Sequence, residues 1–190
     1  MGYDNVEWFK SLEQYREWNA RAILAVFAHL GKPESYLDLG CGDAWMVRAA
    51  RQIGAKPSVG VEISRSVFEV CSKYAKVIIR DLTRDFQLDR KFDLVTCIEV
   101  AEHLQPDCTN VFANNLVKHT KHWLVFTAAS PGQDGNGHIN CQPREFWIDL
   151  ITSKGLVYDV DSTQHIKDTW TYVTGPMFWL PQNVIVFKAV

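Results

Sequence analysis

From about Gly31 onward, short apolar runs alternate with amphipathic stretches of helical period. The strand-like runs are Ser35–Leu39, Ser58–Glu62, Lys76–Arg80, Phe92–Ile98, His122–Thr127, Leu156–Asp159 and Asn183–Lys188. The helical stretches lie near Asp43–Ile53, Ser64–Tyr74, Pro106–Thr120 and Pro143–Ser153. Alternation of this kind is typical of an α/β fold in which helices cover both faces of a parallel sheet.

Three further segments complete the predicted organisation. Ser11–Leu30 has the pattern of one helix, so we expect residues 1–30 to form a helical cap on a core of residues 31–190, all within one domain. Ala128–Asn140 contains three glycines and no regular period. Because long loops in compact domains are often functional, we expect Ser130–Asn140 within this segment to act as a lid. Asp161–Pro181 has several aromatic residues but no clear period, and no element is assigned to it.

Composition restricts the classes of function. The 190 residues carry a formal net charge of −2 and are 47% hydrophobic, which is ordinary for a soluble globular domain and gives no basic field for a phosphate backbone. No apolar run reaches the ~18 residues of a membrane span. The first eight residues do not resemble an export signal, and Gly2 lacks the following serine or threonine of a myristoylation signal. The five cysteines have no paired spacing, so we expect a reduced, cytoplasmic protein.

The most informative stretch is a buried strand that runs directly into Gly40-Cys41-Gly42. Glycines at the carboxyl end of a central strand let the backbone approach a nucleotide closely. Glu62 ends the next strand, and a carboxylate there can accept hydrogen bonds from both hydroxyls of a ribose. The sequence therefore predicts a cofactor that contains a nucleoside.

Two cofactor classes fit this arrangement, and Trp45 distinguishes between them. The dinucleotide fingerprint requires Gly or Ala three residues after Gly42, where helix and strand pack closely beside the pyrophosphate. Trp45 occupies that position and is too large, so we expect it to act as a wedge in the core. Asp38 would also repel a pyrophosphate. It suits instead the ammonium group of S-adenosylmethionine, which has a ribose and no phosphate.

Several motifs together resemble one family. Asp38-Leu39-Gly40-Cys41-Gly42 is similar to motif I of the class I S-adenosylmethionine-dependent methyltransferases, and Phe92–Leu104 resembles their fourth strand and the turn after it. Glu62 matches the ribose ligand of that family, and Asp81 lies where the family has an acid near the adenine. The resemblance implies a Rossmann-like, mostly parallel seven-stranded sheet whose last strand is antiparallel. It also implies cofactor contacts from Asp38, Gly40, Cys41, Gly42, Glu62, Ile63, Asp81, Leu82 and Glu99.

The residues after the fourth strand are the candidates for catalysis. Methyl transfer is an in-line displacement at the sulfonium methyl group, so positioning of the acceptor supplies much of the acceleration. A base is needed where the acceptor still holds its proton. Glu102 and His103 would lie beside the methyl group, and we expect them to be catalytic, with His103 as the base or the group that orients the acceptor. The predicted activity is methyl transfer to oxygen or nitrogen of a small molecule.

The same turn allows a metal-dependent alternative. Glu99, Glu102 and His103, joined by His138, form a set of carboxylates and imidazoles that suits magnesium or manganese. The pattern resembles the ubiquinone-biosynthesis O-methyltransferases and, with Arg144-Glu145-Phe146, the small-RNA 3′-terminal ribose 2′-O-methyltransferases. In the RNA enzymes the four matched positions bind the metal. Metal-free small-molecule methyltransferases carry the same turn, so both interpretations stay open.

Two other functions remain as alternatives to a small-molecule enzyme. One is an RNA ribose 2′-O-methyltransferase, which the net charge of −2 disfavours. The other is a non-catalytic cofactor-binding subunit that works through a partner. A cavity above Gly40–Gly42 would favour an enzyme, whereas an exposed apolar patch at Trp170–Trp179 without such a cavity would favour the subunit. No feature of the sequence predicts an oligomeric state.

Overall fold

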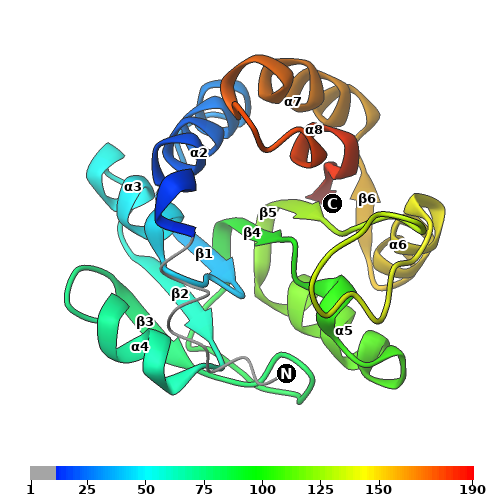
Figure 1. Cartoon of the computed structure of the whole chain (residues 1–190), viewed down its shortest axis with the longest axis horizontal. Helices are drawn as coiled ribbons and strands as arrows, with labels where there is room; N and C mark the ends of the chain where they lie inside the picture. The colour runs from blue at the N-terminus through cyan, green and yellow to red at the C-terminus, as the bar shows by residue number, and fades with distance from the viewer. Residues whose placement is uncertain (1–11) are drawn as a thin grey trace.

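The computed structural model describes residues 12–190, which contain a seven-stranded sheet (Figure 1). Its strands are β1 (Tyr36–Leu39), β2 (Ser58–Glu62), β3 (Lys76–Ile79), β4 (Phe92–Ile98), β5 (Thr120–Thr127), β6 (Leu156–Tyr158) and β7 (Ile185–Ala189). They lie in the order β3-β2-β1-β4-β5-β7-β6. Strands β1 to β5 pair in parallel, whereas β7 is antiparallel to both β5 and β6. The expected Rossmann-like sheet with an antiparallel last strand is therefore confirmed.

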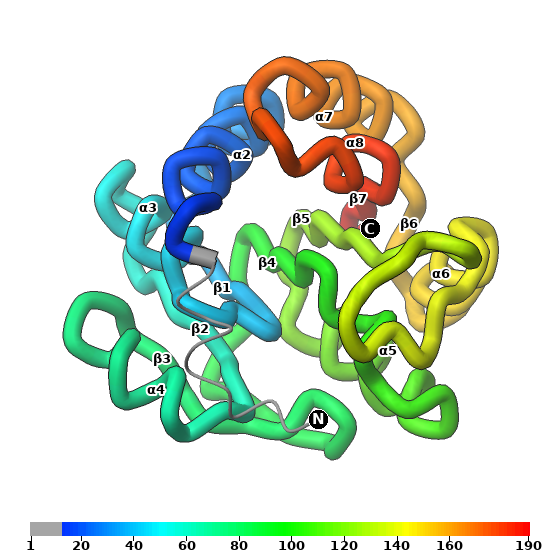
Figure 2. Tube along the Cα trace, in the orientation of Figure 1, coloured from blue at the N-terminus to red at the C-terminus, as the bar shows by residue number. Residues whose placement is uncertain are grey.

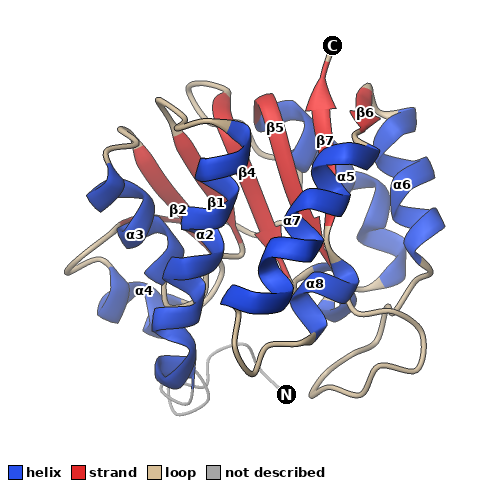
Figure 3. Ribbon diagram, turned by 90° about the horizontal axis from the view of Figure 1, so that it is seen from above, coloured by secondary structure: helices blue, strands red, loops and turns tan. Residues whose placement is uncertain are grey.

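Helices cover both faces of the sheet, because the central strands bury apolar side chains on both sides (Figure 3). One face carries α2 (Arg16–Leu30), α3 (Trp45–Ile53), α4 (Arg65–Cys71) and α7 (Val160–Val173). The other face carries α5 (Thr109–His119) and α6 (Arg144–Ser153). A short α8 (Trp179–Asn183) precedes β7, and the 3₁₀ turns are η1 (Leu12–Tyr15), η2 (Ala101–His103) and η3 (Pro106–Cys108).

Helix α7 fills most of the segment to which the sequence assigned no element. Asp159 caps its start by accepting a hydrogen bond from the Ser162 amide at 2.9 Å. Ile166 and Trp170, four residues apart, are fully buried, and the Trp170 indole donates to the Ala22 carbonyl on α2 at 3.1 Å. The helix contains three threonines, which lower its intrinsic helix propensity and weaken the apolar period in the sequence. Packing against α2 overrides that local preference.

Most other boundaries differ from the expected ones by a few residues. Helix α2 begins at Arg16 after the turn η1, rather than at Ser11, which lies outside the described residues together with Gly2. Helix α4 ends at Cys71, three residues before the expected Tyr74. Asn183 was predicted to start the last strand but instead ends α8. None of the described helices is both long and apolar enough to cross a lipid bilayer.

Trp45 is not the core wedge that the sequence suggested. Its ring is half-buried between two guanidinium groups, with Arg16 at 4.9 Å and Arg48 at 4.6 Å from the ring centroid. Cation–π contact of this kind suits a tryptophan at the border between core and solvent. It also ties α2 to the start of α3.

A close contact between Gly60 and Cys41 generates a prediction about stability. A Cβ atom at Gly60, in the middle of β2, would clash with the Cys41 Sγ and come within 2.9 Å of its Cβ. We therefore expect Gly60→Ala to lower the free energy of unfolding by about 1–3 kcal/mol, as overpacking of a core does. Urea denaturation measures this, and adding Cys41→Gly should restore part of the loss. Wild-type stability in Gly60→Ala would contradict the contact.

Candidate functional site

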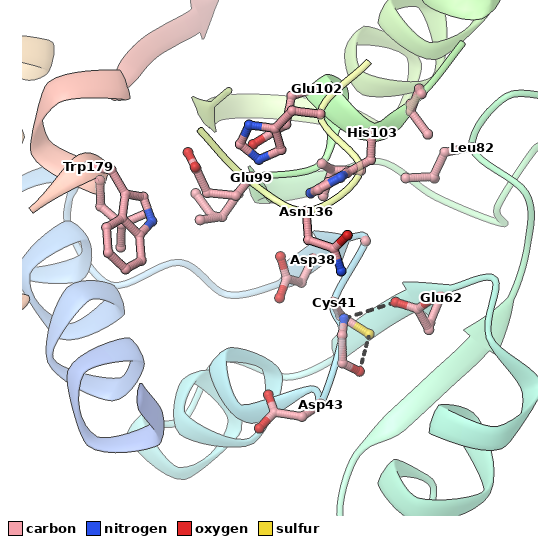
Figure 4. A pocket seen from close by; sticks show the side chains of 18 of the residues that line it. Asp38, Cys41, Asp43, Glu62, Leu82, Glu99, Glu102, His103, Asn136 and Trp179 are labelled. Carbon is pink, nitrogen blue, oxygen red and sulfur yellow. Dashed lines mark hydrogen bonds between the residues drawn. The ribbon is translucent and has the colours of Figure 1, made fainter. Parts of the chain in front are cut away.

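A cavity of about 780 Å³ lies at the carboxyl ends of the first four strands. Its walls come from the turns after β1, β2, β3 and β4, from the loop between β5 and α6, and from the segment before β7 (Figure 4). The structure brings together every residue that the sequence placed at the site: Asp38, Gly40, Cys41, Gly42, Glu62, Ile63, Asp81, Leu82, Glu99, Glu102, His103 and His138.

The glycine turn after β1 is held to β2 through its backbone. The amides of Gly40 and Cys41 donate to the Val61 carbonyl at 2.9 and 3.0 Å. Gly40 and Gly42 have φ angles of 82° and 50°, which other residues adopt only with strain. The Cys41 thiol packs against Gly60, and burial raises the pKa of this thiol well above its usual range. Cys41 thus fills space beneath the turn and is not a reactive nucleophile.

Glu62 fastens this turn to the end of β2. Its carboxylate accepts hydrogen bonds from the amides of Gly42, Ile63 and Ser64 at 2.9 to 3.0 Å, and Figure 4 draws the one from the glycine turn. Burial raises the pKa of Glu62, and these three amides oppose that rise by stabilising the charged form. A carboxylate oxygen has more than one acceptor site, so Glu62 can still receive hydroxyl groups from a ligand.

Asp38 lies within β1, next to its last residue, in the middle of the sheet. Its Oδ1 accepts a hydrogen bond from the Thr96 hydroxyl at 2.7 Å, and Thr96 in turn contacts the Tyr36 hydroxyl at 2.6 Å. Burial raises the pKa of Asp38 to about 7, and the Thr96 hydrogen bond limits the rise. A carboxyl group that is half ionised near neutral pH, inside a cavity, is suited to bind a cationic ligand group.

Two other acids line the same cavity with different partners. Asp43, which the sequence analysis did not single out, accepts a hydrogen bond from Arg16 Nε at 3.1 Å and so joins α2 to the glycine turn. Asp81 accepts from the amide and the hydroxyl of Thr83 at 2.9 and 2.6 Å. Its carboxylate therefore stabilises the local turn as well as facing the cavity.

The turn after β4 begins with Glu99, which has a φ of 54°. This left-handed backbone is strained for a residue with a Cβ, and such strain is concentrated at functional sites. The Glu99 amide donates to the Thr127 hydroxyl at 2.9 Å. Its Oε1 accepts from the Asn183 side-chain amide at 3.1 Å, and the same Asn183 nitrogen lies 3.1 Å from the Gln133 Oε1. Hydrogen bonds to β5 and to α8 thus hold Glu99 in place.

Glu102 has the most unfavourable environment of the site. It is fully buried, and neither of its carboxylate oxygens has a hydrogen-bond partner among the described residues. Burial and the nearby Glu99 carboxylate raise the pKa of Glu102 well above its ordinary value. A buried polar group without a partner costs about 1–3 kcal/mol, and more when charged. This carboxylate is therefore the group in the cavity most in need of a ligand.

The two histidines are oriented by backbone carbonyls of the loop between β5 and α6. His103 Nδ1 lies 3.2 Å from the Gly137 carbonyl, and His138 Nδ1 lies 3.1 Å from the Gln133 carbonyl. Because a carbonyl can only accept, both rings carry a proton on Nδ1 and have their lone pair on Nε2. Burial lowers the pKa of His103, so that its ring is neutral near pH 7.

The segment before β7 forms part of the cavity wall. Met177, Phe178, Trp179 and Leu180 line it from a segment that had no predicted structure. From the N-terminal helix, Tyr15 and Asn19 line the cavity. Trp18 is not part of the lining and packs against Gly175, and the Arg21 guanidinium lies 4.6 Å from the centroid of the Trp18 ring. No local pattern marks the segment before β7, because its role depends on contacts with distant elements.

Comparison with known proteins agrees with this arrangement. A family model described as a methyltransferase domain matches residues 11–157. The chain belongs to this methyltransferase family. The resemblance to the class I S-adenosylmethionine-dependent methyltransferases is thereby confirmed.

Individual relatives are similar over different shares of the chain. The ubiquinone biosynthesis O-methyltransferase of Rickettsia akari (strain Hartford) is 32% identical over 99 residues, which are 49% of this chain and 38% of that protein. Magnesium protoporphyrin IX methyltransferase from Synechocystis PCC 6803, crystallised with SAH, superimposes with a TM-score of 0.66 at 15% identity over 91% of this chain and 81% of that one. The sugar N-methyltransferase KedS8 from Streptoalloteichus sp ATCC 53650 superimposes with a TM-score of 0.65 at 17% identity, over 92% of this chain and 86% of that one.

The strained backbone of Glu99 predicts that the usual order of stability of glycine and alanine substitutions is reversed at this position. Alanine normally stabilises a chain more than glycine does. At a φ of 54° the order should invert, and we expect Glu99→Gly to be more stable than Glu99→Ala by about 1 kcal/mol. Urea unfolding of both variants measures the difference.

Gln105, in the same turn, supplies the matched control. It has an ordinary φ of −61° and an exposed side chain. Gln105→Ala should therefore be at least as stable as Gln105→Gly. The same order at both positions would contradict a strained Glu99.

Proposed function

We propose that this chain is an S-adenosylmethionine-dependent methyltransferase that acts on oxygen or nitrogen of a small molecule. The observation that carries the proposal is the pair of acids Asp38 and Glu62, at the ends of β1 and β2, on either side of the glycine turn in one cavity. Asp38 would bind the ammonium group of the cofactor and Glu62 its ribose. Asp81 and Leu82 would contact the adenine.

The residues after β4 supply the groups that the reaction needs. A lone pair of the acceptor forms a bond to the methyl carbon while the carbon–sulfur bond breaks and the sulfonium becomes a thioether. The acceptor proton passes to His103, whose lowered pKa leaves its Nε2 able to accept it. Glu102 is the second candidate base, since its raised pKa brings a carboxyl group closer to neutral pH.

The alternatives to a small-molecule enzyme receive less support. The cavity above Gly40–Gly42 favours an enzyme over a subunit that acts only through a partner. Trp170, at the start of the suspected apolar patch, is buried against α2, although Tyr172 and Phe178 are exposed. Among the described residues that line the cavity there is no lysine or arginine to attract RNA phosphates. The cytoplasmic location stays a prediction.

Asp38 generates a prediction about pH. Because the pKa of Asp38 is raised to about 7, its carboxyl group must lose a proton before it can pair with the cofactor ammonium. We expect the affinity for S-adenosylhomocysteine to fall about tenfold from about pH 8 to about pH 6. Isothermal titration calorimetry in buffers of different ionisation enthalpy should show a proton released on binding near neutral pH.

Three variants make this test specific. Asp38→Asn should weaken binding at every pH and remove the slope. Thr96→Val removes the donor that limits the pKa of Asp38, so it should move the midpoint to higher pH. Asp81→Asn keeps Asp38 and should keep the slope. Affinity independent of pH in the wild type would reject this role of Asp38, and no binding by folded protein would reject the proposed function.

A metal-assisted form of the same reaction has its own supporting observation. Glu102, His103 and His138 can each offer one ligand atom, and these atoms lie within 4.8 Å of one another. The unpartnered Glu102 carboxylate and the two Nε2 lone pairs fit a divalent cation such as Mg²⁺ or Mn²⁺. Such an ion would hold a hydroxyl acceptor and favour its ionised form.

Manganese binding distinguishes metal-assisted methyl transfer from methyl transfer without a metal. If the ion is used, Mn²⁺ should bind at one site, seen by loss of the free-ion electron paramagnetic resonance signal, and His138→Ala should abolish that binding. His165→Ala is the matched control, because His165 stacks on His29 in α2, away from the cavity lining. Methyl transfer that is unchanged in EDTA would reject the metal-assisted form.

A further inference from the structure

The cavity extends beyond the glycine turn to the turn after β4 and the segment before β7. Its volume of about 780 Å³ lies in the upper part of the range of about 300–1,000 Å³ that is usual for ligand pockets. Figure 4 shows Glu99, Glu102, His103 and Trp179 on the opposite side of the view from Asp43 and Glu62. Given the proposed function, on which this inference rests, the side with Glu99 and Trp179 is where the methyl acceptor would bind.

The ionisable side chains that line the cavity are acids and two histidines. Seven carboxyl groups line it, and no lysine or arginine is among the described residues that do so: Asp38, Asp43, Glu62, Asp81, Glu99, Glu102 and Asp134. Asp43 is paired with Arg16, and raised pKa values leave Asp38 and Glu102 partly protonated near pH 7, so the Glu99 carboxylate is the group on the acceptor side that opposes an anion. A negative charge placed beside a carboxylate in such a site is unfavourable. The lining therefore acts against any acceptor that carries an anionic group.

The remaining wall on the acceptor side is aromatic. Trp179 is half-buried and meets Tyr15 edge to face with ring centroids 6.1 Å apart. Phe178 packs against Trp179 at 5.3 Å and is 66% exposed at the mouth of the cavity. Faces and edges of this kind suit a flat apolar ligand.

The position of Glu99 between these two features is fixed. Asn183, which is 5% exposed, holds the Glu99 carboxylate from the same short helix that carries Trp179. The Glu99 carboxylate and the Trp179 ring therefore have a fixed position relative to each other. A ligand that packs against Trp179 brings its polar end to a carboxylate, not to a cation.

We propose that the methyl acceptor is a flat, largely apolar phenol or amine that bears no carboxylate, phosphate or sulfate group. The Tyr15, Phe178 and Trp179 rings contact its body, and the Glu99 carboxylate selects against negative charge. A protonated amine elsewhere on the molecule is favoured by the same field.

Three phenols of matched size test this proposal: tyramine, 4-ethylphenol and 4-hydroxyphenylacetate, which are cationic, neutral and anionic at pH 7. Each is titrated by calorimetry, up to millimolar concentration and in EDTA, into protein saturated with S-adenosylhomocysteine. Tyramine and 4-ethylphenol should each bind at least about tenfold more tightly than 4-hydroxyphenylacetate. Equal or tighter binding of the anion overturns the proposal, and so does binding of none of the three.

Three variants distinguish the effect of the Glu99 charge on phenol binding from the effect of the aromatic wall. Glu99→Gln keeps the acceptor oxygen for Asn183 and removes the charge, so it should reduce the difference between the neutral and the anionic phenol several-fold. Glu145→Gln, on the exposed side of α6, should leave that difference unchanged. Phe178→Ala should weaken all three phenols alike. Protein that binds S-adenosylhomocysteine but fails these tests refutes only the acceptor class, whereas failure to bind S-adenosylhomocysteine refutes the proposed function.

Discussion

The reversal of strand order beside β1 is the constraint on which the site depends. From β1 the chain moves outward through β2 and β3 and then returns to place β4 on the other side of β1. The connections that leave β1 and β4 diverge, so a crevice opens at the carboxyl ends of these strands. The glycine turn, Glu62 and the β4 turn meet there for this reason. The Glu62 carboxylate then joins the ends of β1 and β2 through the Gly42 amide.

Unfavourable features are concentrated at this one edge of the molecule. Asp38 and Glu102 are buried acids with raised pKa values, and Glu99 has a strained backbone. Such residues persist only where the surrounding structure holds them in place. Here the two apolar layers of the sheet do so, since Asp38 lies within the buried strand β1 and Glu99 follows directly from the buried strand β4. The local cost is offset once a cation or a proton donor reaches these carboxyl groups.

The sequence predicts best the parts of the fold whose signal is local. Strands β2 and β4 match their expected bounds, because each is a buried run bordered by polar or turn residues. The acids and glycines of the cofactor side were found because their spacing follows from strand length and turn geometry. Helix α7 escaped detection, since its threonines weaken the helical signal and its packing partner, Ala22 on α2, is distant in sequence.

The acceptor side was harder to predict for the same physical reason. Asn183 contacts Glu99, which lies 84 positions earlier in the sequence, and no local sequence pattern indicates that these two residues meet. Asn183 was assigned to a strand, where its side chain would have had a different direction. Trp179 lies four residues earlier and faces the cavity only because α8 turns the chain before β7. Contacts of this kind follow from tertiary packing rather than from periodicity.

The loop between β5 and α6, which the sequence suggested as a lid, is fixed along much of its length. Figure 2 shows segment 128–143 as a wide excursion beside α5 and α6. The amides of Ile139 and Asn140 both donate to the Glu102 carbonyl at 2.9 Å, and Gln133 is joined to Asn183. Only the exposed tip, residues 134–137, lies between these anchors. Closure over a bound acceptor would therefore move this tip together with the Gly137 carbonyl that orients His103, whereas the Gln133 carbonyl that orients His138 belongs to the anchored part of the loop.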